Sequence, residues 1–227
     1  MDLNVRDAAA IFEVSEAQID RWVAEDGLPA RRVDGRDYFN RTELLEWATV
    51  RRVRFRPDLF RQSPRSEGLV EALEVGGVIA DVSGADKAAV LRAAVDRMNL
   101  PKDFDRSMLL QLFLTREAAG STAIGGGIAI PHPRQPVVLP VGKPSLTLCF
   151  LNRPVDFGAA DHRAVETLFV LISPTIRAHL RMLARVVCAL GDDRLRAALA
   201  RKAPRDEIMN EFARIESTFD QPAGGGD

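Results

Sequence analysis

A histidine between two prolines ends the segment of this chain with the clearest chemical potential. Three glycines, Gly125–Gly127, precede a short apolar run, Ile128–Ile130, and Pro131, His132 and Pro133 follow it. Glycine lets backbone N–H groups approach an anion closely, and a short strand is stiff enough to place one group accurately. An imidazole at a strand end can have one nitrogen fixed by a hydrogen bond while the other acts as a nucleophile. His132 is therefore a candidate nucleophile.

The same features also occur without any chemistry. A histidine between prolines is more often a loop residue than a nucleophile, and glycine-rich turns are common. No lysine follows these glycines as it does in a P-loop, so nucleotide binding is not predicted. His132, His179 and the carboxylates show no metal-ligand spacing, so no metal site is predicted either.

Alternating helices and strands must position this segment. Apolar residues recur with helical spacing in 87–98 and 106–119, and a further helix is predicted after Pro174. Ser145–Leu151 and Val165–Ile172 are short apolar runs between polar turns, which is typical of buried strands. This alternation predicts an α/β fold.

The residues around His132 resemble the active-site segment of class IIA domains of the bacterial phosphotransferase system, of the fructose/mannitol and nitrogen-regulatory type. In that family a hydrophobic helix and Arg-Glu lead through a turn to Ser-Thr-Gly-Ile-Gly-Asn-Gly-Ile-Ala-Ile-Pro-His. The matching residues here are Arg116-Glu117, Ser121-Thr122, Ile124-Gly125, Gly127 and all of Ile128–His132. The resemblance spans residues 68–217 and implies a class IIA-type mixed sheet flanked by helices.

The resemblance also implies roles for single residues. In the family the Pro-His histidine accepts the phosphoryl group, and a second histidine and the arginine lie beside it, which correspond here to His132, His179 and Arg116. Arg116 would neutralise part of the roughly two negative charges of the phosphoryl group. Ser121 and Thr122 would donate hydroxyl and backbone N–H hydrogen bonds to its oxygens. The structural alternatives are a surface arginine, a helix-surface histidine and two turn residues.

Partners follow from the same resemblance. The donor would be an HPr-like phosphocarrier protein, a regulatory target protein is a possible second partner, and transfer between histidines needs no cofactor. Four positions depart from the family pattern: Ala123 replaces Gly, Gly126 replaces Asn, and Pro133-Arg134 replaces Gly-Lys. None of them removes the nucleophile, but they bear on which donor docks and how fast transfer runs.

Residues 1–50 predict a separate small unit. After an alanine-rich first helix, Ser15 begins a second helix with a capping box, since a glutamine follows three residues later. Gly27 ends that helix, Asp34-Gly35 marks a hairpin turn and Asn40 begins a third helix. The order helix, turn, helix, hairpin, helix resembles the excisionase/MerR-like winged helix-turn-helix domain.

That second resemblance implies DNA binding through the second helix, in the major groove. Gln18 and Arg21 on this helix suit base edges or phosphates. The arginines expected to contact phosphates from the hairpin are Arg31, Arg32 and Arg36. Acidic residues on the same helix, among them Glu16 and Glu25, oppose this interpretation, so a winged fold used for protein contacts is the alternative.

Between the two units, residues 51–66 predict a basic linker with six arginines and one acid. Residues 67–217 then form the IIA-type domain, and residues 218–227 a disordered tail. The net charge of −1 gives no global attraction to nucleic acid or membrane. No secretory signal and no apolar run of about 20 residues occurs, so we expect a cytoplasmic protein without membrane contact.

Together these patterns predict a cytoplasmic regulatory phosphocarrier coupled to a DNA-binding domain. It would carry phosphoryl groups between protein histidines rather than act on a small molecule. Two alternatives are a transport component that passes phosphate to a sugar permease, and a regulator that docks on its target without being phosphorylated.

Overall fold

The structure is a computed structural model that describes residues 3–33, 35–51, 53–55, 68–133 and 143–219. The chain divides into two compact units, Met1–Pro64 and Arg65–Asp227. Residues 56–66 of the predicted linker and residues 220–227 of the predicted tail lie outside the described residues. The last helix continues two residues into the predicted tail, to Phe219.

The first unit contains three helices and a small antiparallel sheet among its described residues. Its elements are β1 (Leu3–Asn4), α1 (Val5–Phe12), α2 (Glu16–Glu25), β2 (Arg31–Val33), β3 (Arg36–Phe39) and α3 (Arg41–Arg51). The strand order is β1-β3-β2, so the predicted hairpin forms β2 and β3. The short strand β1 is an addition that the sequence pattern did not predict.

Local capping and an aromatic cluster hold the first unit together. Ser15 caps α2 as predicted, because its Oγ accepts the backbone N–H of Gln18 at 3.2 Å. The complete capping box is instead recorded at α1, between Asn4 and Asp7. In the core, three aromatic rings contact one another: the centroid of Trp22 lies 5.5 Å from that of Phe12 and 5.0 Å from that of Trp47, and the last two are 6.1 Å apart. Edge and tilted contacts of this kind favour aromatic packing beyond the area that they bury.

The second unit is an α/β domain built on a mixed five-stranded sheet, which confirms the predicted fold class. Its first elements are α4 (Leu69–Gly76), β4 (Val78–Val82), α5 (Lys87–Arg97), α6 (Arg106–Ala118), β5 (Ala123–Gly125) and β6 (Ile128–Ala129). The later elements are β7 (Ser145–Val155), β8 (Val165–Ile172), α7 (Ile176–Ala189), α8 (Asp193–Ala200) and α9 (Arg205–Phe219). The strand order is β4-β7-β8-β6-β5, with β4–β7 and β6–β8 parallel and the other pairs antiparallel.

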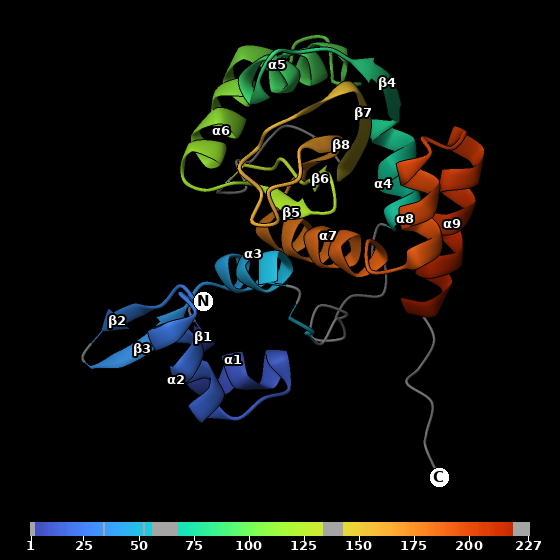
Figure 1. The fold of residues 1–227 in the computed structure, drawn as a ribbon. Coiled ribbons are helices and arrows are strands. Elements are labelled where there is room, and N and C mark those ends of the chain that lie inside the picture. The colour runs from blue at the N-terminus through green and yellow to red at the C-terminus, as the bar shows by residue number, and fades with distance from the viewer. Residues whose placement is uncertain (1–2, 34, 52, 56–67, 134–142, 220–227) are drawn as a thin grey trace. The chain divides into compact units, whose positions relative to one another are not determined.

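Helices cover both faces of this sheet, which explains why its central strands are almost continuously apolar. Along β7, Leu146, Leu148 and Phe150 enter one core, while Cys149 and Leu151 enter the other. Helices α4, α7, α8 and α9 pack on the first face, and α5 and α6 pack on the second, as Figure 1 shows. The sheet is therefore the middle layer of three.

A carboxylate from α9 caps the N-terminus of α4, because the residue before α4 has no side chain that could cap it. Glu216 accepts the backbone N–H groups of Leu69 and Val70 at 2.6 and 3.3 Å and pairs with Arg185 at 3.2 Å. A Cβ at Gly68 would lie 2.5 Å from the same carboxylate, so glycine leaves room for this contact. The last helix of the unit thus fixes the first one.

The contacts of Asp192 at the start of α8 predict that the stability of the fold depends on pH. Asp192 accepts the N–H groups of Arg194 and Leu195, and the side chain of Arg214 donates to it at 2.6 Å. The Arg214 hydrogen bond is the main cause that lowers the pKa of Asp192, with the backbone N–H groups adding to it. Because the folded pKa lies below the unfolded value of about 3.9, the ionised carboxylate stabilises the fold above pH ~4. This stabilisation is lost as the pH falls through the folded pKa.

Asp192→Asn keeps a capping side chain but removes the charge. Since both partners are partly exposed, we expect the parent to be more stable than the variant by at most about 1 kcal/mol at neutral pH. The difference should shrink as the pH falls below about 4. Urea unfolding at several pH values measures it, and Asp193→Asn, one residue further on, is the matched control. A difference that stays constant from neutral pH to pH ~2 would contradict this assignment.

Candidate functional site

Backbone hydrogen bonds on both sides place His132 at the end of a strand. The N–H of Ile130 donates to the carbonyl of Thr122 at 3.0 Å, and the N–H of Leu171 donates to the carbonyl of Pro131 at 3.0 Å. Because β6 runs parallel to β8, His132 follows the carboxyl end of β6 beside the carboxyl end of β8. Its side chain is buried, with 3% of its surface exposed.

The ring of His132 is oriented by a hydrogen bond to its own strand. Its Nδ1 lies 2.7 Å from the carbonyl oxygen of Ile130. A carbonyl oxygen only accepts hydrogen bonds, so Nδ1 carries the hydrogen and donates it. In the neutral ring the lone pair then belongs to Nε2. This is the arrangement that a nucleophilic imidazole needs, with one nitrogen fixed and the other reactive.

The second predicted histidine lies beside the first. His179 belongs to the first turn of α7, and the centroids of the two rings are 5.2 Å apart. Thr175 caps this helix by accepting the N–H of Ala178 at 3.1 Å. The start of a helix carries a partial positive charge, which favours an anion nearby. The structure therefore brings His132 and His179 together at a place suited to negative charge.

The predicted arginine and the two predicted hydroxyl residues lie in and just after the last turn of α6, ahead of the strand β5 that pairs with β6. Arg116, in the last turn of α6, is 8% exposed and donates from Nη1 to the carbonyl of Gly120 at 2.8 Å. Ser121 Oγ accepts the N–H of Ala123 at 3.1 Å. The turn is joined to the active strand through the Thr122 carbonyl, which Ile130 contacts.

Thr122 differs from the prediction. We expected its hydroxyl and N–H to donate to phosphoryl oxygens, but both donate to the carboxylate of Glu117, at 2.7 and 3.0 Å. Glu117 is itself buried, and Lys87 Nζ lies 3.5 Å from its other oxygen. Glu117 was part of the Arg-Glu match but received no role, and nothing in the sequence linked it to Lys87, which lies thirty residues earlier.

The glycine turn lies away from His132, at the other end of the strand. Gly125, Gly126 and Gly127 all have positive φ, from 65° to 86°, and connect β5 to the beginning of β6. His132 lies beyond the other end of β6. The N–H of Gly126 donates to the side chain of Asp161 at 2.7 Å, and this hydrogen bond is the main cause of the lowered pKa of Asp161. These glycines shape a separate place on the unit and do not surround His132.

In the first unit, the predicted DNA contacts occupy different environments. Arg21 on α2 is exposed, as are Arg31 and Arg36 on the hairpin, whereas Gln18 is half-buried. Arg32 is also exposed, but its guanidinium makes two hydrogen bonds to Asp37, at 2.9 and 3.0 Å. This hydrogen bonding raises the pKa of Arg32 and neutralises its charge locally. Arg32 is thus a poorer phosphate ligand than the sequence indicated.

Among the residues that the structure describes, no group of three or more His, Cys, Asp or Glu side chains is arranged to hold a metal ion. No helix in this part of the chain is both long and apolar enough to cross a membrane.

The Glu117 contacts generate a prediction for the site. Glu117→Ala leaves the two buried donors of Thr122 without an acceptor, so we expect the free energy of unfolding to fall by about 2–4 kcal/mol. Glu71→Ala, which removes an exposed ion pair of 2.6 Å with Lys143, is the control and should cost less than about 1 kcal/mol. Urea unfolding compares the two. Equal losses in both variants would show that the buried carboxylate does not stabilise the turn.

Family models match both units of the chain. Residues 71–215 match the family described as "Phosphoenolpyruvate-dependent sugar phosphotransferase system, EIIA 2". Residues 3–57 match a family described as "Helix-turn-helix domain". The two matches agree with the two resemblances seen in the sequence.

Curated relatives support the first of these matches. The nitrogen regulatory protein of Pseudomonas aeruginosa is 34% identical over 148 residues, which cover 63% of this chain and 93% of that protein. The nitrogen regulatory protein of Escherichia coli is 31% identical over 132 residues, which cover 56% of this chain and 76% of that protein. A fructose-specific EIIA component from Haloferax volcanii is 26% identical over 113 residues, covering 49% and 71%.

Solved structures share the fold. The nitrogen regulatory protein IIA-Ntr of Neisseria meningitidis superposes with a TM-score of 0.51 at 24% identity, over 60% of this chain and 91% of that one. A putative IIA domain from Streptococcus pyogenes gives 0.52 at 20% identity, over 69% and 99%. The family match covers well over half of the residues and includes the strand, the turn and both histidines of the site. The chain belongs to the EIIA 2 family of the phosphoenolpyruvate-dependent sugar phosphotransferase system, and it carries a helix-turn-helix domain ahead of the EIIA domain.

Proposed function

We propose that this chain is a regulatory phosphocarrier that accepts a phosphoryl group on Nε2 of His132 from an HPr-like protein. The observation that carries this proposal is the 2.7 Å contact between Nδ1 of His132 and the carbonyl of Ile130. It assigns the hydrogen to Nδ1 and the nucleophilic lone pair to Nε2. The proposal also places the protein in the cytoplasm, where such a donor would meet it.

The chemistry is a phosphoryl transfer between two imidazoles. Nε2 of His132 attacks the phosphorus atom, and the bond from phosphorus to the donor's ring nitrogen breaks with its electron pair returning to that ring. His179 and the start of α7 stabilise the negative charge on the phosphoryl oxygens. Arg116, whose guanidinium donates to the carbonyl of Gly120, is a forked donor of the kind that suits the same oxygens.

A regulatory role is favoured over sugar transport by two observations. The nitrogen regulatory proteins of Pseudomonas aeruginosa and Bradyrhizobium diazoefficiens match over 93% and 84% of their own length, against 71% for the fructose-specific EIIA component. The helix-turn-helix domain gives the chain a second unit through which a signal could act. The fructose-specific relative keeps transfer to a sugar permease as the alternative.

We further propose that the first unit binds DNA and that phosphorylation weakens this binding. Arg21 and Arg36 are exposed and suit phosphates, the exposed Arg31 lies on the same hairpin as Arg36, and Arg32 is held by Asp37. The six arginines of residues 51–66 would be shared between DNA and the new negative charge on His132.

Phosphorylation tests the acceptor. His132→Ala should abolish uptake of label from phosphoenolpyruvate in the presence of the general first enzyme and an HPr-like carrier. His179→Ala should slow uptake by about one to two decades, since it removes one charge-assisted contact. His162→Ala is the control, because His162 lies exposed in a loop and should behave like the parent. If His132→Ala takes up label at the parent's rate, His132 is not the phosphoryl acceptor.

DNA titration tests the first unit. Arg21→Gln and Arg36→Gln should each weaken binding and reduce the slope of log affinity against log salt by about 1, as expected for one lost phosphate contact. Arg32→Gln should change both quantities less, because Asp37 already neutralises Arg32. Phosphorylation should lower the affinity by a factor of about 5–150. If none of the forms binds DNA, the assignment fails, and equal affinities in both phosphorylation states would refute the coupling alone.

A further inference from the structure

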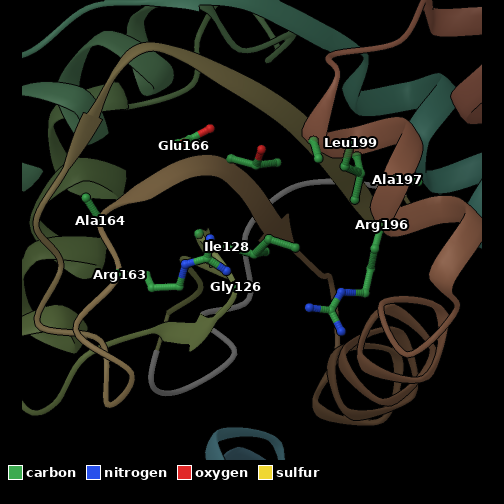
Figure 2. A pocket seen from close by; sticks show the side chains of 11 residues that line it. Gly126, Ile128, Arg163, Ala164, Glu166, Arg196, Ala197 and Leu199 are labelled. Carbon is green, nitrogen blue, oxygen red and sulfur yellow. The ribbon is translucent and has the colours of Figure 1, made fainter.

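A pocket lies at the end of β6 that is remote from His132. It has a volume of about 350 Å³ and is bounded by the glycine turn, by the loop before β8 and by α8. Arg163 comes from that loop and Arg196 from α8. Figure 2 shows their guanidinium groups reaching into the pocket from opposite sides, with their ends turned toward each other. Two cations that face each other across a cavity call for an anion between them.

Among the described residues, neither Arg163 nor Arg196 forms an ion pair, although the charge of Arg163 contributes to the lowered pKa of Asp161. Asp161 lies near Arg163, but its carboxylate accepts the backbone N–H groups of Gly126 and Arg163, at 2.7 and 3.2 Å. Glu166 lines the pocket too, and in Figure 2 its carboxylate lies well apart from both guanidinium groups. The pocket therefore has a cationic side and a separate acidic side.

The absence of a side chain at Gly126 leaves room for the guanidinium of Arg196. A Cβ added at Gly126 would lie 3.2 Å from Nη2 of Arg196, so any side chain at this position would crowd the guanidinium. The family pattern favours Asn at the same position. The departure from the pattern thus coincides with the residue that lets Arg196 lie against the turn.

The shape and charge of the pocket indicate one class of ligand. A phosphoryl group offers several oxygens to two forked guanidinium groups. The volume is in the range of small-molecule sites, about 300–1000 Å³, and is larger than a bare phosphate fills. Ile128 and Leu199 form apolar wall, and the carboxylate of Glu166 is an acceptor for hydroxyl groups. We propose that this pocket binds a phosphorylated polyhydroxy compound, such as a sugar phosphate, at a site separate from His132.

Titration of the full chain with glucose 6-phosphate, inorganic phosphate and glucose tests the proposal. In ¹H–¹⁵N spectra, glucose 6-phosphate should shift the signals of Gly126 and Gly127. Inorganic phosphate should shift the same signals with at least about tenfold weaker affinity, and glucose should shift neither. Stronger binding of phosphate alone than of the ester would overturn the assigned ligand class, and unchanged glycine signals would overturn the site.

Variants separate this pocket from the phosphoryl site. Arg163→Gln and Arg196→Gln should each lower the affinity for glucose 6-phosphate at least about tenfold, which is the loss expected for one charge-assisted contact. Gly126→Asn, which suits positive φ but crowds Arg196, should weaken it as well. His132→Ala and Arg177→Gln, an exposed charge change on α7, should leave the affinity unchanged. Loss of binding in His132→Ala, with normal binding in the pocket variants, would place the ligand at His132 and refute the inference.

Discussion

A single buried carboxylate organises the region around His132. Glu117 lies at the end of α6, and a charge in that position needs partners because desolvation is costly. Lys87 supplies the charge from the start of α5, and Thr122 supplies two hydrogen bonds from the start of the turn. Thr122 in turn holds Ile130, and Ile130 orients the ring of His132. A chain of contacts therefore runs from two helices to the reactive nitrogen, and each link fixes the next one.

The sheet topology explains why the site lies where it does. β6 and β8 run parallel, so their carboxyl ends meet, and β7 begins at the same edge because it is antiparallel to β8. The helix that follows β8 brings His179 and its positively polarised first turn to this edge. The opposite edge collects the glycine turn, Arg163 and Arg196. One short strand thus separates two places that both suit negative charge.

The sequence predicted much of this and missed the rest for a common reason. A continuous motif predicted His132, and a match further along the chain predicted His179. Unbroken apolar runs predicted the two buried strands. The contacts that escaped join residues distant in sequence, such as Glu216 with Leu69 and Glu117 with Lys87. Only the fold decides which carboxylate meets which donor. The pairing of Arg32 with Asp37 likewise depends on the register of the hairpin.

The aromatic cluster of the first unit has an optical consequence. The chain contains two tryptophans, Trp22 and Trp47, and both belong to that cluster, while the histidine pair lies in the other unit. Tryptophan fluorescence therefore reports on the first unit alone, without any introduced dye. Any change in the emission of these two rings that accompanies chemistry at His132 must have travelled from one unit to the other. The native chain thus carries a built-in reporter of communication between its units.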